Sequence, residues 1–301
     1  MANLEPAPAD IADAAAVTEI VRAVESSLYG ATTFSQGDLE GEWSELDLER
    51  DTRVVRDGDR VVGYGVVRER GERWEVEAYV HPAAQGRGIG RLIAAGLEDD
   101  AARNGARRIH NSVLEADAAA RRLLESLGYD SVRVFREMRI ALAAPPPAPE
   151  WPDGLRVVPF DPDRDAHEFH VAQEEAFADH WEYAPRDFGE WAKSHLESER
   201  FDPTLWCVVR AGNEIAAGTI CTGDTYGGGF VHALFTRRPW RKQGVGAALL
   251  GDAFVRFWER GERSVGLGVD AGNDTGAFRL YERAGMAPAL GWVVYEKQLA
   301  G

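Results

Sequence analysis

The chain has 301 residues, of which 45% are hydrophobic, and a formal net charge of −16. Its length is sufficient for two hydrophobic cores, and no apolar run reaches the roughly 20 residues that a membrane-spanning helix needs. The negative charge opposes binding to nucleic acid and to anionic membranes, so we expect neither as a partner.

Neither the start of the chain nor its two cysteines indicates a functional site. The first twenty residues hold acidic side chains and no lysine or arginine, so the cationic start of a secretory signal is missing and we expect a cytoplasmic location. The two cysteines, Cys207 and Cys221, fall inside strand-like patterns. We expect both to be small buried side chains rather than a disulfide or a metal pair, and we expect no metal.

The first half of the chain alternates strand and helix patterns. A hairpin is expected where Asp57-Gly58-Asp59 separates two alternating apolar segments, because this sequence favours a two-residue turn. A glycine-rich segment then leads into apolar residues at helical spacing. The expected elements, in order, are strands over 53–56, 61–67 and 74–80, a helix from Ile89 to Gly105, a strand over 108–114, a helix over 118–127 and a strand over 132–142.

A proline-rich segment follows over 144–150, and its prolines lack the amide hydrogens that a helix or a central strand requires. We expect it to run extended as a semi-rigid spacer. The second half then repeats the order of the first. Its expected elements are a strand over 155–160, helices over 166–177 and 188–196, a hairpin across Gly212-Asn213, a strand over 230–235, a helix over 245–260, a strand over 265–269, a helix over 275–284 and a strand over 292–297.

The two halves also share sequence. The segment 120–129 recurs as 277–286, and 54–58 returns as 208–212, at a nearly constant offset. This repetition predicts two copies of one domain, each a mixed α/β sheet flanked by helices. We expect an amino-terminal domain over 1–143, a linker over 144–150 and a carboxy-terminal domain over 151–301.

A glycine-rich segment precedes a helix in both copies, over 85–90 in the first and 241–246 in the second. A strand, a glycine turn and a helix start present free N–H groups and a positive dipole end to an anion, so we expect a pyrophosphate ligand. Neither segment is a dinucleotide fingerprint, because Ile93 and Leu249 stand at its third glycine position. Neither ends in the Gly-Lys-Ser/Thr of a P-loop.

The segments resemble the loop of the GNAT superfamily of acyl-CoA-dependent N-acyltransferases, Gln/Arg-x-x-Gly-x-Gly/Ala after a strand that ends in Val-x-Pro. The first copy matches with Val80-His81-Pro82 before its loop, and the second has Thr236 where valine is usual. The family's second signature, Asn-x-x-x-Ala-x-x-Leu-Tyr-Glu-x-x-Gly-Phe, is matched over 273–286, with methionine in place of the phenylalanine. The chain is therefore similar to tandem GNAT acetyltransferases, with a layout like that of the mycothiol synthases.

The resemblance implies acetyl-CoA as the co-substrate, held by backbone N–H groups at one or both loops. Arginine and lysine side chains beside the loops can add charge-assisted bonds to its phosphates. The pantetheine arm is expected along an open strand edge where two strands splay. The implied cofactor-binding residues are Val80, Gln85, Gly86, Arg87, Gly88, Ile89 and Gly90 in the first copy, and Phe235, Thr236, Arg241, Lys242, Gln243, Gly244, Val245, Gly246 and Asn273 in the second.

The catalytic candidates lie in the second copy. Tyr281 falls on the family's catalytic position, where a phenol can donate a proton to the departing thiolate, and the first copy has Leu124 there. A backbone N–H near Phe235 or Thr236 is expected to meet the oxyanion. His232, on the same strand, is the candidate base, and a simple hydrogen-bonding role is its alternative. We expect the second copy to be catalytic and the first to be a scaffold or a regulatory binder.

Asp179, His180 and Trp181 follow the first helix of the second copy, a region that builds the acceptor pocket in related enzymes. The acidic side chains around them suit a cationic amine, and an acidic helix end with a packing tryptophan is the structural alternative. We therefore expect acetylation of a primary amine of a small molecule. Mycothiol synthase activity and a silent acyl-CoA sensor are the two alternatives. We expect a monomer or a homodimer.

Overall fold

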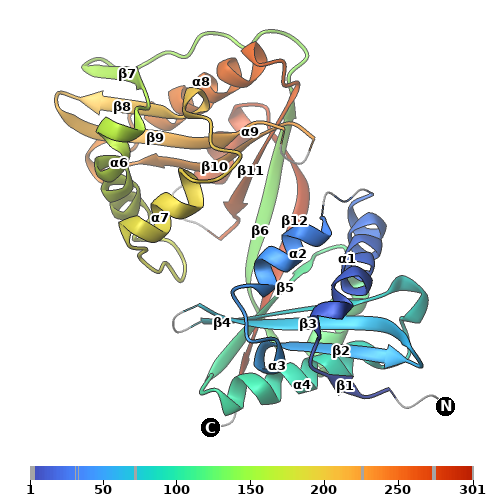
Figure 1. Ribbon diagram of the computed structural model, residues 1–301. Helices are drawn as coiled ribbons and strands as arrows, with labels where there is room; N and C mark the ends of the chain where they lie inside the picture. The colour runs from blue at the N-terminus through green and yellow to red at the C-terminus, as the bar shows by residue number, and fades with distance from the viewer. Residues whose placement is uncertain are drawn as a thin grey trace. The chain divides into compact units, whose positions relative to one another are not determined.

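The protein forms two compact units, each with strands in a mixed parallel and antiparallel arrangement and with helices that flank them (Figure 1). The first unit holds residues 1–134 and 291–301, and the second holds 135–290. Within the chain, the computed structural model describes residues 4–30, 32, 34–70, 73–224, 227–272 and 276–299. None of the helices in these ranges is long and apolar enough to cross a bilayer.

The first unit contains β1 (Pro6–Ala7), η1 (Ile11–Asp13), α1 (Ala14–Tyr29), α2 (Gln36–Trp43), α3 (Leu48–Asp51), β2 (Thr52–Asp57), β3 (Arg60–Arg70), β4 (Arg73–Val80), η2 (Pro82–Ala84), α4 (Ile89–Arg103), β5 (Arg108–Leu114), α5 (Ala118–Ser126) and most of β12 (Ala287–Gln298). Its strand order is β1-β2-β3-β4-β5-β12. Neighbouring strands are antiparallel except β4 and β5, which are parallel.

Two glycines of β3 let α4 approach the sheet of the first unit closely. A Cβ at Gly65 would lie 2.3 Å from Ile93 Cγ2, and one at Gly63 would lie 2.7 Å from Ile89 Cγ2. The residue between these glycines, Tyr64, is buried on the other face with side chains of α1 and α2. These contacts hold the start of α4, and with it the first glycine loop, against the sheet.

The second unit contains most of β6 (Asp130–Ala141), β7 (Leu155–Pro159), α6 (Pro162–Phe177), α7 (Phe188–His195), η3 (Pro203–Leu205), β8 (Cys207–Ala211), β9 (Glu214–Thr222), β10 (Gly229–Thr236), η4 (Arg238–Trp240), α8 (Val245–Glu259), β11 (Ser264–Asp270) and α9 (Ala277–Arg283). Its strand order is β6-β11-β10-β9-β8-β7, antiparallel except between β10 and β11. Cys207 and Cys221 are buried free thiols, as expected, and burial raises the pKa of both.

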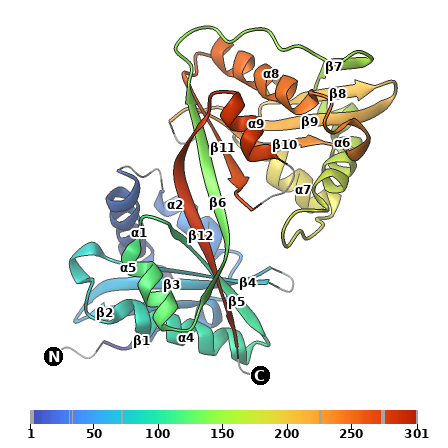
Figure 2. The same ribbon diagram turned by 180° about the vertical axis from the view of Figure 1, so that it is seen from behind.

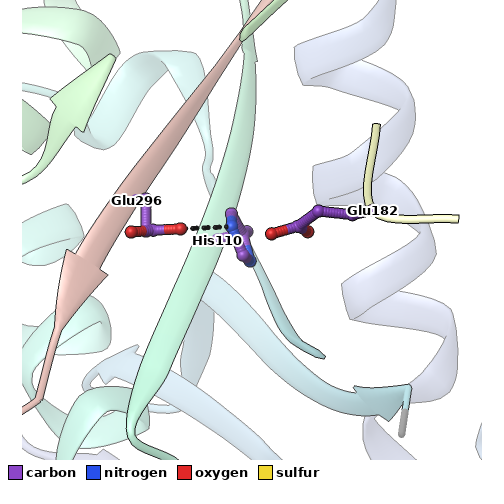
Figure 3. Close-up of side chains that lie close together, drawn as sticks. All are labelled: His110, Glu182 and Glu296. Atoms are coloured by element: carbon purple, nitrogen blue, oxygen red, sulfur yellow. Dashed lines mark hydrogen bonds and ion pairs between the residues drawn. The ribbon is translucent and has the colours of Figure 1, made fainter. Parts of the chain in front are cut away.

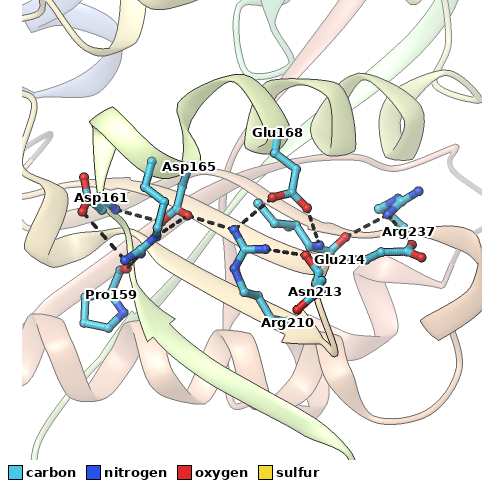
Figure 4. A network of polar contacts seen from close by, with 10 residues as sticks. Pro159, Asp161, Asp165, Glu168, Arg210, Asn213, Glu214 and Arg237 are labelled. Carbon is cyan, nitrogen blue, oxygen red and sulfur yellow. Dashed lines mark hydrogen bonds and ion pairs between the residues drawn. The ribbon is translucent and has the colours of Figure 1, made fainter.

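One ion pair recurs in both units and fixes the first helix to the sheet. In the second unit, Asp165 is fully buried and lies 2.9 Å from Arg210, which also lies 2.9 Å from Glu168 (Figure 4). In the first unit, Asp13 lies 2.7 Å from Arg56, at the corresponding place on β2. The repeated pair shows that the sequence duplication extends to buried polar contacts.

The two sequence copies exchange their last strands. Residues 135–141 of β6 pair with 264–270 of β11 in the second unit, although β6 belongs to the first sequence copy. Residues 292–298 of β12 pair with 108–114 of β5 in the first unit, although β12 belongs to the second copy. Figure 2 shows β6 beside β11 and β12 beside β5. Each sheet is therefore completed by a strand from the other half of the sequence.

The elements expected from sequence are present within a few residues, including both hairpins. The pattern did not reveal α1 and α2, which precede the first hairpin. The compact units differ from the expected domains, 1–143 and 151–301, by the two exchanged strands. Alternation predicts a strand but not the sheet that it joins, because the neighbouring strands of both copies accept the same pattern. The segment 144–150 contains no helix or strand.

Candidate active site

Both glycine-rich segments form the same turn between a strand and a helix. The first connects β4 to α4 through η2, and the second connects β10 to α8 through η4. Each contains two left-handed residues, Gly86 (φ 76°) and Gly88 (φ 84°) in the first turn, and Lys242 (φ 62°) and Gly244 (φ 87°) in the second. The turn is therefore kept even where a lysine replaces one of the glycines.

These turns end at the amino terminus of a helix. The first bonds of α-helical spacing run from Leu92 N–H to Gly88 O and from Ala248 N–H to Gly244 O, both with an N···O distance of 3.1 Å. In the second turn the Ala247 N–H also bonds Gly244 O, at 3.1 Å. The first N–H groups of a helix lack the acceptor four residues earlier that later ones use, and the helix dipole adds positive potential, so each turn suits a diphosphate. The structure thus brings together the predicted residues 85–90 in one unit and 241–246 in the other. Their binding of acetyl-CoA stays a prediction.

The arginines predicted beside the loops already have protein partners. Arg87 Nη1 lies 2.7 Å from Asp57 Oδ2. Arg241 donates from Nε to Thr236 O (3.0 Å) and from Nη2 to Ala176 O (2.8 Å), so it ties the end of β10 to the end of α6. Phosphate binding by either arginine therefore has to compete with these bonds.

In both units the strand before the loop separates from its parallel neighbour. β4 is paired with β5 over 74–76 and continues unpaired on that side to Val80. β10 is paired with β11 over 229–231 and continues to Thr236. The strand edges beyond these points offer N–H and C=O groups to an extended ligand such as a pantetheine arm. The expected splay is present in both units.

The strand that borders this gap differs between the units. The register between β9 and β10 shifts between Val231, opposite Cys221, and Ala233, opposite Ile220, which makes His232 the extra residue of a β-bulge. The register between β3 and β4 runs without a shift. Bulges bend a strand, redirect a side chain and recur next to active sites. His232, the candidate base, therefore lies in a β-bulge of β10, and the corresponding strand of the first unit, β4, has no such bulge in its pairing with β3.

The His232 ring is partly exposed and has defined neighbours. Its Nε2 lies 2.8 Å from Thr222 Oγ1, and its centroid lies 4.9 Å from that of Phe230. Desolvation lowers the pKa of His232 below its ordinary value, with smaller contributions from the positive charge of His195 and Arg200. The ring is therefore neutral at pH 7, which is the form that accepts a proton.

Tyr281 lies in α9 and is 7% exposed, within the hydrophobic core of the second unit. Burial raises the pKa of Tyr281 to about 12, so the phenol keeps its proton at neutral pH. The corresponding residue of α5, Leu124, is also buried and has no proton to donate. The structure shows this difference between the copies, and the role of Tyr281 as an acid stays a prediction.

Phe235 and Thr236 form the end of β10. The Phe235 ring is buried, with its centroid 5.0 Å from that of Phe169 in α6. The carbonyl oxygen of Thr236 accepts the bond from Arg241 Nε. These contacts fix the backbone at the place where a donor for the oxyanion is expected, and that role stays a prediction.

Asp179 connects the two predicted binding regions of the second copy. Its carboxylate lies 2.5 Å from Arg238 Nη2 and 3.5 Å from Arg241 Nη1. Hydrogen bonding to Arg238 chiefly, and the charge of both arginines, hold the pKa of Asp179 below its ordinary value. A predicted acceptor residue therefore touches a predicted cofactor residue, and an amine has to compete with the arginines for it.

The other two predicted acceptor residues pack against aromatic rings. The His180 centroid lies 4.6 Å from that of Phe177, and burial lowers the pKa of His180. The Trp181 centroid lies 6.2 Å from that of Phe135 on β6. Contact of either residue with an acceptor stays a prediction. The remaining predicted residue, Asn273, lies outside the described residues.

Two glutamates on the exchanged strands were not singled out from sequence. In the first unit, Glu296 Oε2 on β12 lies 3.0 Å from His110 Nε2, a contact drawn as a dashed line in Figure 3, and 3.3 Å from Arg108 Nη1. In the second unit, Glu137 Oε1 on β6 lies 2.6 Å from Arg139 Nε. Neither glutamate belongs to a motif, and the surroundings of both follow from the strand exchange, which no local pattern reveals.

Comparison with known proteins agrees with this geometry. The chain matches the Acetyltransferase (GNAT) family over residues 18–129 and 164–286, once in each sequence copy. A mycothiol acetyltransferase of Thermobispora bispora is 34% identical over 263 residues, which is 81% of this chain and 82% of that protein. A GCN5-related N-acetyltransferase from Sphaerobacter thermophilus is 31% identical, with a TM-score of 0.84 over 99% of this chain and 96% of that one.

A second solved structure supports the tandem arrangement at the level of the fold. It is a tandem GNAT protein from the clavulanic acid biosynthesis pathway, 17% identical, with a TM-score of 0.74 over 99% of both chains. The tandem layout, the mixed α/β fold and the class of enzyme that the loops predicted, an acetyl-CoA-dependent N-acetyltransferase, are thus confirmed. The chain belongs to the acetyltransferase (GNAT) family, and each of its sequence copies matches that family.

Proposed function

We propose that the second unit transfers the acetyl group of acetyl-CoA to a primary amine of a small molecule. The proposal rests on one difference between the two units. Among the described residues, the second unit combines the splayed strands with a bulge at His232 and with a phenol, Tyr281. The first unit has the loop and the splay but a regular β4 and Leu124. Its proposed role is that of a scaffold or a regulatory binder of the same cofactor.

In the proposed reaction, the amine nitrogen attacks the carbonyl carbon of the thioester. A carbon–nitrogen bond forms and the carbon–sulfur bond breaks, so the products are an acetamide and CoA. An ammonium loses two protons on this path. His232 accepts the first, directly or through a water, before the nitrogen attacks and passes it to solvent, and the second leaves the nitrogen for solvent as the tetrahedral intermediate collapses. The departing thiolate gains one proton from Tyr281, which recovers one from solvent, so one proton is released overall. A backbone N–H near Phe235 or Thr236 stabilises the oxyanion.

The pKa of Tyr281 determines how it assists. An ordinary thiol has a pKa of about 8.5, and the pKa of Tyr281 is about 12, so complete transfer to a solvated thiolate is uphill by roughly 5 kcal/mol. Burial penalises a thiolate as it does a phenolate, which reduces this difference inside the protein. Tyr281 therefore acts first as a hydrogen-bond donor to the sulfur, and the proton moves as the carbon–sulfur bond breaks.

The first candidate for the acceptor within this class comes from the relatives. The Thermobispora bispora protein that is 34% identical to this chain is named a mycothiol acetyltransferase. We therefore include the amine form of mycothiol, without its acetyl group, in the acceptor panel. A catalytically silent acyl-CoA sensor is the alternative from another class, and it predicts cofactor binding with no turnover.

The test is release of CoA from acetyl-CoA in the presence of a panel of small primary amines and the amine form of mycothiol. We expect turnover with at least one amine. Tyr281→Phe is expected to lower kcat by roughly 10²–10⁴-fold, because the proton donor is lost, while CoA affinity stays unchanged. Tyr129→Phe, which removes another buried phenol in the first unit, is the matched control and should retain activity. Wild-type rates in Tyr281→Phe would refute the acid role, and CoA binding without turnover would favour the sensor.

A further inference from the structure

A row of residues crosses the sheet of the second unit where β10 and β11 separate. It consists of Thr222 on β9, His232 on β10, Gly268 on β11 and Glu137 on β6, and we call it the cross-strand row. Because β6 belongs to the first sequence copy, the row joins residues of both copies within one sheet.

Strand register places these residues side by side. Gly268 is directly opposite Glu137 in the antiparallel pair of β11 and β6. The last parallel pair of β10 and β11 is Val231 with Leu267, so His232 and Gly268 are the first residues beyond the pairing on each strand. His232 Nε2 in turn lies 2.8 Å from Thr222 Oγ1. The row therefore marks the mouth of the gap between β10 and β11.

The row lies on the face of the sheet opposite α8. A Cβ at Gly229 would lie 2.3 Å from Phe257, which puts Gly229 on the face that α8 covers. Side chains alternate along a strand, so Phe230 and its partner in register, Gly266, belong to the other face. Gly268 lies two residues beyond Gly266 and shares that face, and so does its partner on β6. The His232 ring leans the same way, against Phe230.

The surface of the sheet is open at Gly268 and covered at Gly266, two residues earlier on the same face. A Cβ at Gly268 would meet no atom of the described residues within 4 Å. A Cβ at Gly266 would lie 3.1 Å from the Phe230 ring and 3.3 Å from Arg139 Cζ. His232 and Glu137 stand on β10 and β6, which lie on either side of β11 and are about 10 Å apart, two strand spacings, where all three strands are paired. The glycine between them therefore leaves a slot the width of one side chain.

The carboxylate of Glu137 borders this slot and can accept further hydrogen bonds. The residue is 7% exposed, and Arg139 Nε donates to its Oε1 at 2.6 Å. Arg139 also reaches Ser264 Oγ at 3.4 Å, on the side away from Gly268. Within the described part of the chain, no hydrogen bond is made to Glu137 Oε2. A carboxylate accepts several hydrogen bonds, so this oxygen can receive a further cationic donor.

We propose that Glu137 binds the ammonium group of the acceptor in the slot at Gly268. The amine nitrogen is then held between the carboxylate and His232, at the mouth of the gap where the thioester is expected. The acceptor is a cationic primary amine that reaches its nitrogen into a slot one side chain wide, and a neutral analogue lacks the charge that Glu137 pairs. This inference rests on the proposed function of the second unit.

The test measures binding of three amines, cysteamine, spermidine and glucosamine, to the full-length protein saturated with CoA, by ligand-observed NMR titration. Glucose is the uncharged counterpart of glucosamine. We expect at least one amine to bind and glucose not to bind. Glu137→Gln should raise the dissociation constant of that amine at least tenfold and leave CoA affinity unchanged, which also reports that the variant is folded.

Two further variants separate a binding role from a structural ion pair. Arg139→Gln removes the competitor for the carboxylate, so amine binding should stay the same or tighten. If the pair were merely structural, Arg139→Gln would weaken binding as Glu137→Gln does. Glu296→Gln, on the other exchanged strand and also ion-paired to an arginine, is the matched control and should leave amine binding unchanged.

Three results overturn the inference: no amine binds the wild-type protein, Glu137→Gln binds the amine as tightly as the wild type does, or Arg139→Gln matches Glu137→Gln in its loss. Turnover of acetyl-CoA with the same amines is measured in parallel. Amine binding that depends on Glu137 but is followed by no turnover supports the ammonium site and refutes the proposed function, so the two failures are distinguishable.

Discussion

The bulge in β10 gives His232 its chemical character. At this bulge the His232 ring lies against Phe230 and within 2.8 Å of Thr222 Oγ1, and desolvation lowers its pKa. A histidine in this state is neutral at physiological pH and needs no further activation to accept a proton. Position in the strand, together with residue type, thus makes this histidine a candidate base.

This pKa shift predicts the pH dependence of acetyl transfer. The neutral form of His232 is the active one, and its pKa lies below the ordinary value of about 6.5. We expect kcat/KM to show an acid limb with an apparent pKa below about 6.5 and to fall roughly tenfold per pH unit beneath it. His232→Gln should abolish this limb and lower the rate, as a pH profile of both proteins will show.

A neighbouring histidine provides the control for that profile. Burial also lowers the pKa of His195, whose Nδ1 lies 2.9 Å from Trp191 O in α7. His195→Gln should keep the acid limb. A limb that persists in His232→Gln but disappears in His195→Gln would transfer the role of base to His195.

At the scale of elements, the two glycine turns are one conformation made from different residues. The position that Gly86 occupies in the first turn holds Lys242 in the second, with φ of 76° and 62°. A left-handed conformation costs a residue with a Cβ roughly 1–2 kcal/mol relative to the right-handed one. The second turn therefore carries backbone strain that the first avoids.

This difference gives opposite expectations for paired substitutions. Gly86→Ala should destabilise the first unit by about 1 kcal/mol through the backbone alone, because a Cβ there would meet nothing within 4 Å. Lys242→Gly should leave the second unit as stable as before or slightly more stable, since relief of strain is offset by roughly 0.4–1 kcal/mol of unfolded-state entropy. Lys242→Ala controls for loss of the lysine side chain. Calorimetric melting of the variants checks this, and equal destabilisation by Gly86→Ala and Lys242→Gly would contradict it.

Elements with local signals were predictable from the sequence, and their partners were not. Gly58 and Gly212 mark the hairpins, and the glycine loops mark the starts of α4 and α8, because each needs particular residues at particular dihedral angles. The candidate Tyr281 followed from a family signature. The bulge at His232 and the placement of Glu137 depend on which strands pair, and strand pairing is decided by tertiary contacts that one sequence does not display.

At the scale of the whole molecule, the strand exchange makes the first unit depend on the end of the chain. Val293 and Tyr295 of β12 are buried in the core of the first unit, Tyr295 hydrogen-bonds Arg121 and Glu125 of α5, and Lys297 lies 2.5 Å from Glu98 of α4. Each large buried apolar side chain contributes roughly 1.5–3 kcal/mol, and a domain has about 5–15 kcal/mol in total. Loss of β12 is therefore comparable with the whole stability of the unit.

Deletion of residues 292–301 should accordingly unfold the first unit and spare the second. Amide hydrogen exchange measures this directly. We expect amides over 109–113 of β5 to lose their protection, and amides over 215–221 of β9 to keep theirs. A synthetic peptide of residues 287–301, added to the truncated protein, should restore protection to β5. Unchanged protection of β5 without the peptide would mean that another strand takes the place of β12.

The exchange also constrains how the gene can change. A split of the gene at the proline-rich segment would yield two polypeptides, and each would lack the last strand of its own sheet. The two halves can therefore diverge in their catalytic residues, as Leu124 and Tyr281 illustrate, but they have to stay in one polypeptide.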